Sequence, residues 1–344
     1  MRCMTLAEWL TKEGHAVFFV SRELPGNLCN VIEDRGHKMH RLPYDVSNRH
    51  SATLVSEYAD WLGVEWQVDA DETRMLCRKP VSLDWLVVDH YAVDYQWEQA
   101  VRSETRNLMV IDDLANRRHA CDLLLDQNYC ADMFSRYHTL VPEECRVLVG
   151  PRYALLRSEF VDARSNSRER DGSIKRILIF LGGSDLTNET EKALHAFRAL
   201  NRPDITADVV VGSSNPLKQH IKAICSTMAN VNFFCQVENM ADLMVRADIS
   251  IGAGGSTTWE RCCLGLPSLV ITVAENQFSI AEAAHQYGAI QYLGRHDSVS
   301  AEDILRSLRD VIKTPDRMRL MSNMAAKLVD GTGAKLVAQA LRQT

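Results

Sequence analysis

Short apolar segments typical of buried strands alternate with longer amphipathic segments typical of helices, and this alternation restricts the fold more than any other feature of the chain. DWLVVD and NLMVID are clear examples of the strand pattern. Alternation of this kind predicts an α/β fold, with parallel sheets covered by helices on both faces. The predicted strands cover residues 16–21, 84–89, 107–112, 121–126, 176–181, 207–211, 231–237, 248–251 and 268–273, and the predicted helices cover 5–13, 51–62, 94–104, 188–200 and 216–228, with another helix opening near 256 and more in the last 45 residues.

The chain is long enough for two domains. At 344 residues it exceeds the size at which one hydrophobic core usually keeps growing. The alternation breaks between 149 and 170, and this segment ends in the polar stretch DARSNSRERD. We therefore predict an N-terminal Rossmann-like domain over 1–160 and a C-terminal Rossmann-like domain over 171–344. Two doubly wound domains in tandem predict a central cleft between them as the ligand site.

The N-terminal domain is expected to lack its first strand. A doubly wound domain normally begins with a strand that becomes central in the sheet, whereas this chain begins inside a helix. Loss of a central strand leaves the backbone groups of its neighbours unpaired, which is costly. A truncated or misassigned start is therefore the favoured interpretation, and a fold that truly begins this way is the alternative.

Charge and composition exclude several classes of protein. Residues 1–160 contain 18 Lys and Arg against 25 Asp and Glu, and an acidic half of this kind argues against nucleic acid and against an anionic membrane surface. The ten cysteines show no CxxC spacing, so neither a metal site nor a redox site is expected. Neither a membrane span nor a signal peptide is apparent. The sequence predicts a cytoplasmic protein, with a monomer as the default.

A glycine-rich turn follows the predicted strand at 248–251 and leads into a helix (DISIGAGGSTTWE). Its glycines allow close approach of a ligand, and amides at the start of a helix attract a pyrophosphate. Glu260, one turn later, is placed to accept hydrogen bonds from ribose hydroxyls. The spacing is not GxGxxG, so NAD is not expected, and a turn without a ligand is the alternative. The residues of this predicted site are Gly252, Gly254, Gly255, Ser256, Thr257 and Thr258.

A second loop of the same kind follows the strand at 176–181. It contains Gly182, Gly183, Ser184 and Asp185 and leads toward a helix. No Lys follows the glycines, so the loop is not a P-loop and ATP-driven chemistry is not supported.

Three predicted strands of the first half end in polar residues. Asp89, His90 and Tyr91 follow the first, Asp112-Asp113 the second, and Gln127-Asn128 the third. Each alone fits a loop or capping residue, but together at one sheet edge they predict an acid–base site. Four tryptophans lie in apolar patterns and are predicted to be core residues: Trp9, Trp61, Trp85 and Trp97.

These motifs resemble the UDP-2,4-diacetamido-2,4,6-trideoxy-β-L-altropyranose hydrolases of pseudaminic acid biosynthesis, the PseG family. The resemblance covers nearly the whole chain in order and implies a GT-B fold, shared with the MurG-type glycosyltransferase that uses UDP-N-acetylglucosamine. It also implies that water releases UDP from a UDP-sugar without a metal or other cofactor. The matching segments are MRCMTLA (1–7), DHY (89–91), IDD (111–113), CDLLLDQN (121–128), YALLRSEF (153–160), 182–185 and 254–260.

The resemblance also implies roles for individual residues. It assigns UDP to the loops at 182–185 and 254–257, ribose to Glu260 and a role near the sugar to Tyr91. Further contacts are expected from Asn128, Arg157 and Gln277. The family's presumed catalytic histidine belongs to a GxGH loop that comes before the segment matching Met1, and this sequence does not contain that loop.

Two alternatives stay open at this point. One is a MurG-like glycosyltransferase acting on a lipid acceptor, although the acidic first domain does not favour it. The other is a UDP-sugar-binding protein without catalytic activity, because the expected histidine loop is missing.

Overall fold

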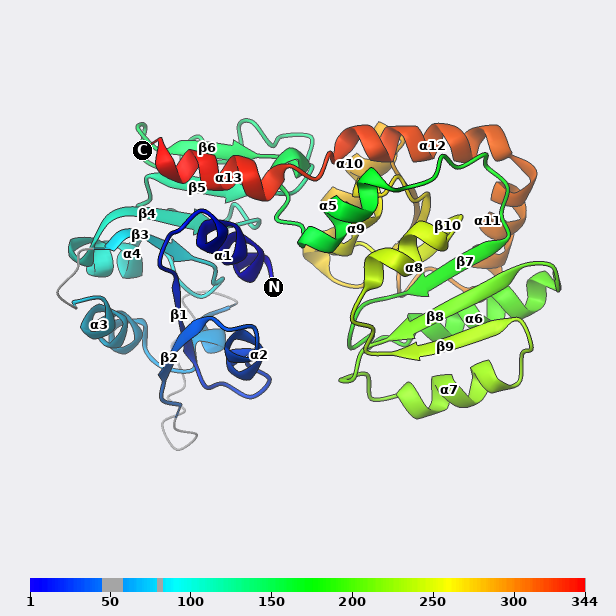
Figure 1. Cartoon of the computed structure of the whole chain (residues 1–344), viewed down its shortest axis with the longest axis horizontal. Helices are drawn as coiled ribbons and strands as arrows, with labels where there is room; N and C mark the ends of the chain where they lie inside the picture. The colour runs from blue at the N-terminus through cyan, green and yellow to red at the C-terminus, as the bar shows by residue number, and fades with distance from the viewer. Residues whose placement is uncertain (45–57, 79–82, 344) are drawn as a thin grey trace. The chain divides into compact units, whose positions relative to one another are not determined.

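The computed structural model describes residues 1–44, 58–78 and 83–343, which fold into two compact units (Figure 1). Unit 1 contains residues 1–128, 132–155 and 333–344, and unit 2 contains residues 129–131 and 156–332. Every strand pair in both units is parallel, and helices cover the sheets. The predicted α/β class is therefore confirmed. The expectation of a ligand site between the units stays a prediction.

The described residues of unit 1 form two parallel sheets, one with the order β3-β4-β5-β6 and one that pairs β1 with β2. The strand predicted before Met1 stays a prediction. The helix predicted over 51–62 lies outside the described residues as far as 57, and its last four residues form η2 (Ala59–Leu62). The other elements are α1 (Arg2–Lys12), β1 (Phe18–Arg22), α2 (Cys29–Asp34), β2 (Lys38–Leu42), α3 (Trp66–Cys77), β3 (Leu83–Val88), α4 (Tyr95–Val101), η3 (Arg102–Glu104), β4 (Thr105–Ile111), β5 (Leu123–Asp126), β6 (Arg146–Val149), η4 (Pro151–Tyr153) and α13 (Gly333–Arg342).

Alternate residues of β4 pack against different helices. Met109 and Ile111 join a buried cluster with residues of α1 and α13. Leu108 and Val110 join another cluster with residues of α3 and α4. Because successive side chains of a strand point to opposite faces, β4 is buried on both sides and its carboxyl end is held firmly.

The C-terminal helix does not follow the predicted division into 1–160 and 171–344. Val337 and Ala338 of α13 are fully buried in the core of unit 1, and the indole of Trp85 donates to the carbonyl of Leu341 at 2.8 Å. A Cβ on Gly333 would lie 2.3 Å from a backbone oxygen of Ala154, so glycine permits this close approach. The chain thus returns to unit 1 because α13 buries its apolar face there.

Unit 2 has one six-stranded parallel sheet with the order β12-β11-β10-β7-β8-β9. In chain order this is the doubly wound arrangement in which the first and fourth strands are neighbours. The elements are α5 (Ser158–Ser165), β7 (Arg176–Phe180), α6 (Glu189–Leu200), β8 (Thr206–Val211), α7 (Lys218–Ser226), β9 (Val231–Cys235), α8 (Met240–Arg246), β10 (Ile249–Ala253), α9 (Thr257–Cys263), β11 (Ser268–Thr272), η5 (Glu275–Gln277), α10 (Phe278–Tyr287), β12 (Gln291–Arg295), α11 (Ala301–Lys313) and α12 (Pro315–Leu328).

The centre of this sheet forms the core of unit 2. Every residue of β10 and β11 is buried, as are the middle residues of β7. Their apolar side chains cluster with residues of α6 and α11. Strands buried on both faces read as continuous apolar runs, and RILIF, ISIGA and SLVIT are such runs.

Candidate functional site

The first candidate site lies at the carboxyl ends of β7 and β10, where the strand order of unit 2 reverses. The chain runs outward from β7 through β8 and β9, whereas β10 lies on the other side of β7. Ile179 pairs with Ile251, and Phe180 with Gly252. Open α/β sheets bind ligands at such a switch point, outside the carboxyl ends of the strands. Both glycine loops predicted from the sequence begin here.

The loop after β7 depends on closely packed glycines. Gly182 has a φ of +101°, in the region that favours glycine. The amide of Gly212 donates to the carbonyl of Gly183 at 3.1 Å, and a Cβ on Gly212 would lie 2.3 Å from that oxygen. Gly183 and Ser184 are exposed, and a Cβ on Gly183 would meet no described atom within 4 Å. The backbone of this loop is thus open to a ligand.

Asp185 lies in the same loop, but its carboxylate caps α6. One oxygen accepts from the amide of Glu189 at 3.0 Å and the other from the amide of Thr190 at 2.9 Å. A carboxylate at this position satisfies amides that lack a partner within the helix. Asp185 therefore fixes the shape of the loop, and its predicted contact with the ligand stays a prediction.

The loop after β10 packs against Gln277. The side-chain oxygen of Gln277 accepts from the amide of Val273 at 3.0 Å, which holds the side chain in place. A Cβ on Gly254 would lie 3.3 Å from the Cβ of Gln277, and a Cβ on Gly255 would lie 3.7 Å from its Nε2. The structure thus brings three predicted site residues together. Ser256, the next residue of the loop, is exposed.

A buried arginine, which the sequence did not indicate, holds the loop after β10 through hydrogen bonds. The guanidinium of Arg261 donates to the carbonyl of Ala253 at 2.8 Å and to the hydroxyls of Thr258 at 3.0 Å and Thr257 at 3.3 Å. Burial lowers its pKa to about 10, so it stays charged at neutral pH. A Cβ on Gly252 would lie 2.3 Å from the guanidinium, which explains why the strand has a glycine there.

Glu260 and Arg157, both predicted site residues, lie together in unit 2. Arg157 is 3.5 Å from a carboxylate oxygen of Glu260 and 3.0 Å from one of Glu159. Burial raises the pKa of Glu260 to about 7, while Arg157 opposes the shift and Glu159 adds to it. Glu260 is therefore close to half-ionised at neutral pH, and a ligand that donates hydrogen bonds to it would favour the ionised form.

The second candidate site is a polar network at the carboxyl ends of β3 and β4 in unit 1. Arg2 donates to both carboxylate oxygens of Asp89, at 2.7 to 3.2 Å, and to Asp113 at 3.2 Å. The hydroxyl of Tyr91 donates to Asp113 at 2.6 Å, and the thiol of Cys3 donates to Asp89 at 3.1 Å. Two carboxylates thus share one guanidinium at the edge where parallel sheets bind ligands.

The charges in this network are fixed by its contacts. Burial opposes ionisation of Asp89, but hydrogen bonds and charge from Arg2 outweigh it and hold the pKa of Asp89 below its ordinary value. Burial, together with the charge of Asp113, raises the pKa of Tyr91, so the phenol stays protonated. The network therefore holds an ionised carboxylate beside a neutral phenol. Arg2 was part of a matching segment in the sequence, but no pattern indicated its pairing across 87 residues.

His90 lies between Asp89 and Tyr91. Its Nδ1 accepts from the amide of Ala92 at 3.1 Å, and its ring interacts with the backbone of Trp61. Burial lowers the pKa of His90, so the ring is neutral at physiological pH. Its role in proton transfer, predicted from the sequence, stays a prediction.

The remaining polar strand ends of unit 1 are directed into the protein. Asp112 is fully buried and accepts from the hydroxyl of Tyr137 at 3.0 Å. Gln127 accepts from the amide of Leu155 at 3.1 Å. Asn128 is 6% exposed, and its predicted contact with the substrate stays a prediction. The expected convergence therefore reduces to the ends of two strands, β3 and β4.

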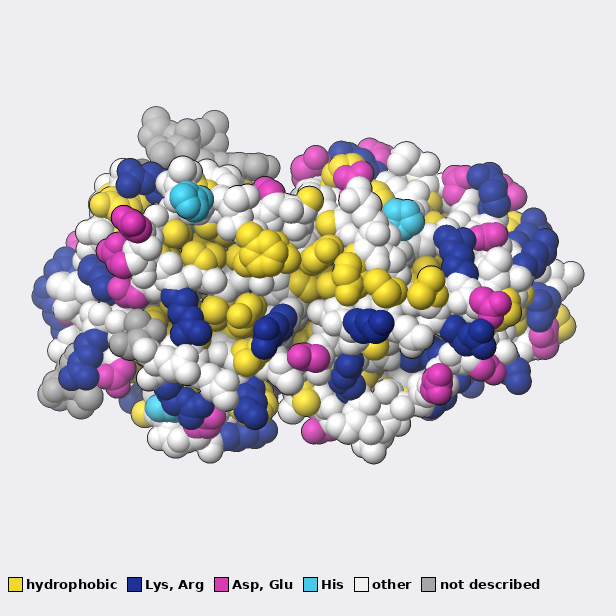
Figure 2. Space-filling model, turned by 90° about the horizontal axis from the view of Figure 1, so that it is seen from above, with side chains coloured by type: hydrophobic (Ala, Val, Ile, Leu, Met, Phe, Trp, Pro, Cys, Tyr) yellow, Lys and Arg dark blue, Asp and Glu magenta, His cyan; other side chains and the backbone are white. Residues whose placement is uncertain are grey.

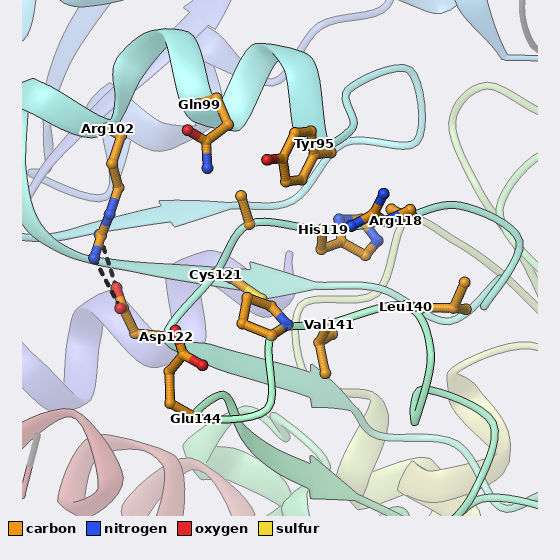
Figure 3. A pocket seen from close by; sticks show the side chains of 12 residues that line it. Tyr95, Gln99, Arg102, Arg118, His119, Cys121, Asp122, Leu140, Val141 and Glu144 are labelled. Carbon is orange, nitrogen blue, oxygen red and sulfur yellow. Dashed lines mark hydrogen bonds and ion pairs between the residues drawn. The ribbon is translucent and has the colours of Figure 1, made fainter.

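A cavity of about 310 Å³ lies at the opposite edge of the same sheet, between α4 and the segments that precede β5 and β6 (Figure 3). Arg102 and Asp122, which line it, form an ion pair at 2.8 Å. His119, which also lines it, bonds the buried carboxylate of Glu98 at 2.7 Å. Parallel sheets bind their ligands at the carboxyl ends of the strands, so we place the functional site at the other edge.

Charges of both signs are interspersed on the face drawn in Figure 2.

Within the described part of the chain, no three His, Cys, Asp or Glu side chains are grouped so that they could hold a metal ion. Among the helices in residues 1–44, 58–78 and 83–343, none combines the length and the apolar character needed to cross a membrane.

The fold is that of known nucleotide-sugar enzymes with the GT-B architecture. The structure of MurG from Acinetobacter baumannii aligns over 100% of this chain and 95% of its own, with a TM-score of 0.68 and 13% identity. A structure of UGT89C1 from Arabidopsis thaliana complexed with UDP aligns over 98% of this chain and 95% of its own, with a TM-score of 0.67 and 12% identity. Fold and sequence relatives together define a UDP-sugar-processing enzyme of the GT-B class.

Sequence comparison is more specific. Residues 177–340 match the family model of the glycosyltransferase family 28 C-terminal domain. The spore coat polysaccharide biosynthesis protein SpsG of Bacillus subtilis is 29% identical over 74% of this chain and 75% of its own length. The UDP-2,4-diacetamido-2,4,6-trideoxy-β-L-altropyranose hydrolase of Campylobacter jejuni is 30% identical over 59% of this chain and 71% of its own length. The chain belongs to the family of this hydrolase, as the resemblance predicted.

Proposed function

We propose that this protein hydrolyses UDP-2,4-diacetamido-2,4,6-trideoxy-β-L-altropyranose to UDP and the free sugar, a step of pseudaminic acid biosynthesis. The observation that carries the proposal is the network of Arg2, Asp89, Asp113 and Tyr91 at a sheet edge of a protein in this hydrolase family. Such a network can orient water and a sugar hydroxyl. In the reaction, water attacks the anomeric carbon, the bond from that carbon to the diphosphate oxygen breaks, and UDP leaves.

Unit 2 supplies the groups that would hold UDP. Backbone amides of the loops at Gly183 and Gly255 lie at the switch point, where they can donate to the diphosphate as it gains charge. Glu260 would accept from the ribose hydroxyls, with Arg157 beside it to stabilise the ionised carboxylate.

Unit 1 supplies the groups that would meet the sugar and water. The hydroxyl of Tyr91 donates its hydrogen bond to Asp113, so its oxygen keeps lone pairs that can accept from a sugar hydroxyl or from water. Asp89, held ionised by Arg2, is the carboxylate that can take the proton from the attacking water. Each group is prearranged by contacts within unit 1, which lowers the cost of organising the transition state.

The test is release of UDP from the UDP-sugar in water enriched in ¹⁸O, with no acceptor added. We expect UDP to accumulate and ¹⁸O to appear at C1 of the sugar and not in UDP. Tyr91→Phe should slow release, and the matched control Met75→Ala, at an exposed position of α3, should not.

Other outcomes point elsewhere. The match to a glycosyltransferase domain supports transfer to an acceptor as a second candidate, and UDP release only after a sugar or lipid acceptor is added would favour it. Binding of UDP and of the UDP-sugar without release under either condition would overturn both candidates and leave a binding protein.

A further inference from the structure

Trp61 is an exposed aromatic residue on a well-anchored turn. The apolar sequence pattern predicted that it would be a core residue, but its exposed fraction is 55%. The neighbouring Leu62 is buried in the core of unit 1. Gly63 ends η2 with a φ of +76°, and a Cβ there would lie 2.6 Å from the side chain of Leu24. The turn is therefore anchored by the burial of Leu62 and by the close packing of Gly63. The indole of Trp61 is nevertheless exposed, because the turn directs it toward solvent.

Three aromatic rings meet at this turn. Tyr58 and Trp61 have ring centroids 5.2 Å apart, and each lies against Tyr91, at 5.3 and 5.8 Å. Tyr91 also donates to Asp113 in the polar network. One residue thus belongs to both the aromatic cluster and the network, so a ligand that reaches the hydroxyl of Tyr91 has aromatic surface beside it.

His90 connects the turn to the end of β3. Its Nδ1 accepts from the amide of Ala92, and its ring interacts with the backbone of Trp61. The end of β3 therefore positions Tyr91 and, through His90, also contacts the turn that carries Trp61. An exposed indole that packs against the ring of Tyr91 beside a polar site is a prearranged binding surface rather than a loose apolar contact.

We propose that Tyr58, Trp61 and the ring of Tyr91 form an aromatic platform that binds the sugar of the nucleotide sugar and selects 6-deoxy sugars. This inference rests on the proposed function. A 6-deoxy sugar with acetamido groups presents methyl groups and a C–H face that can pack on aromatic rings, whereas a 6-hydroxyl would have to give up water there. Trp61 is then a specificity-determining residue, and His90 is its positioning residue.

The test compares wild type with Trp61→Ala, Trp61→Phe and the exposed control Met75→Ala. For each variant we would measure KM for the UDP-6-deoxy sugar, binding of UDP-N-acetylglucosamine and the Ki of UDP. Trp61→Ala should raise KM for the deoxy sugar about tenfold and reduce the preference over UDP-N-acetylglucosamine, while the Ki of UDP stays within twofold. Trp61→Phe should retain most of the affinity. His90→Ala should raise KM in the same way with a smaller change in kcat.

An unchanged KM in Trp61→Ala, or an equal loss of affinity for UDP itself, would overturn the platform. In either case, release of UDP by wild type would leave the proposed function intact. If wild type released no UDP, nothing would consume the ligands. Dissociation constants measured by calorimetry would then make the same comparison, and equal binding of the deoxy sugar by wild type and Trp61→Ala would overturn the platform.

Discussion

The two candidate sites are built in different ways. In the proposed site of unit 2 the groups that would face UDP are largely backbone, in loops that contain glycines at 182, 183, 254 and 255. In the proposed site of unit 1 they are side chains: Arg2 is shared between two carboxylates, and Tyr91 donates to one of them. A backbone site depends on the space that its neighbours leave free, whereas a side-chain site depends on partners that keep its charges in place. Substitutions should therefore separate the two sites by different readouts.

The largest effect is expected from crowding the backbone site. Gly212→Ala places a Cβ 2.3 Å from the carbonyl of Gly183, so the loop after β7 must shift. We expect UDP affinity to fall about 100-fold, the equivalent of one strong hydrogen bond to a charged group, with a stability loss of roughly 1–3 kcal/mol. Calorimetric titration with UDP and urea unfolding would measure these effects.

Gly26→Ala is the matched control for Gly212→Ala. Gly26 lies in unit 1 at a φ of +82°, and a Cβ there meets no described atom within 4 Å. This substitution should cost about 1 kcal/mol through backbone strain and leave UDP affinity unchanged. Equal UDP affinity in the two variants would show that the backbone at Gly183 does not take part in binding.

At the side-chain site of unit 1, a substitution should lower kcat and leave the affinity for UDP unchanged. Tyr91→Phe keeps the ring against Trp61 but removes the hydrogen bond to Asp113. We expect kcat for UDP release to fall about 10- to 100-fold, since a hydrogen bond to a charged group contributes about 1.5–3 kcal/mol. The Ki of UDP should stay within twofold. A loss of UDP affinity as large as the loss of kcat would contradict the division of roles between the units.

The same difference explains how much could be predicted from the sequence. The loops of unit 2 were predictable because local glycine patterns follow strong apolar strands, and the topology then places them at the switch point. The partners in unit 1 were not, because Arg2 reaches Asp89 across 87 residues and nothing local marks that pair. Trp61 was predicted wrongly for a related reason. An apolar pattern shows which residue types lie near one another in the sequence. The exposure of Trp61 depends on how the chain turns at Gly63.

Proton binding at Glu260 gives a third prediction, of intermediate size. In the proposed site the ribose hydroxyls would donate to the ionised carboxylate, so binding of UDP should lower the pKa of Glu260 from about 7. UDP affinity should then rise with pH below 7, by up to about tenfold per pH unit, and level off above it. Without UDP, the raised pKa means that the folded state binds a proton that the unfolded state lacks, so stability should fall as pH rises from about 4.5 to 7. UDP titrations and urea unfolding between pH 5 and 8 would measure both trends.

Two variants sharpen the pH prediction. Glu260→Gln should flatten both dependences. Glu159→Gln removes a nearby negative charge that raises the pKa of Glu260, so it should move the affinity profile to lower pH without removing it. A profile in Glu260→Gln that matches wild type would assign the titration to another group.

The smallest effect is expected at Asp185, where a predicted ligand residue serves as a helix cap. Because both of its carboxylate oxygens accept from amides at the start of α6, Asp185→Ala should cost about 1 kcal/mol of stability, and Asp185→Asn, which keeps one acceptor, less than that. UDP affinity of the folded variants should stay within about twofold of wild type, far from the loss expected for Gly212→Ala. Urea unfolding and UDP titration of the same samples separate the two roles. A large loss of UDP affinity in Asp185→Asn with unchanged stability would mean that this carboxylate meets the ligand, and that the site of unit 2 is not built from backbone alone.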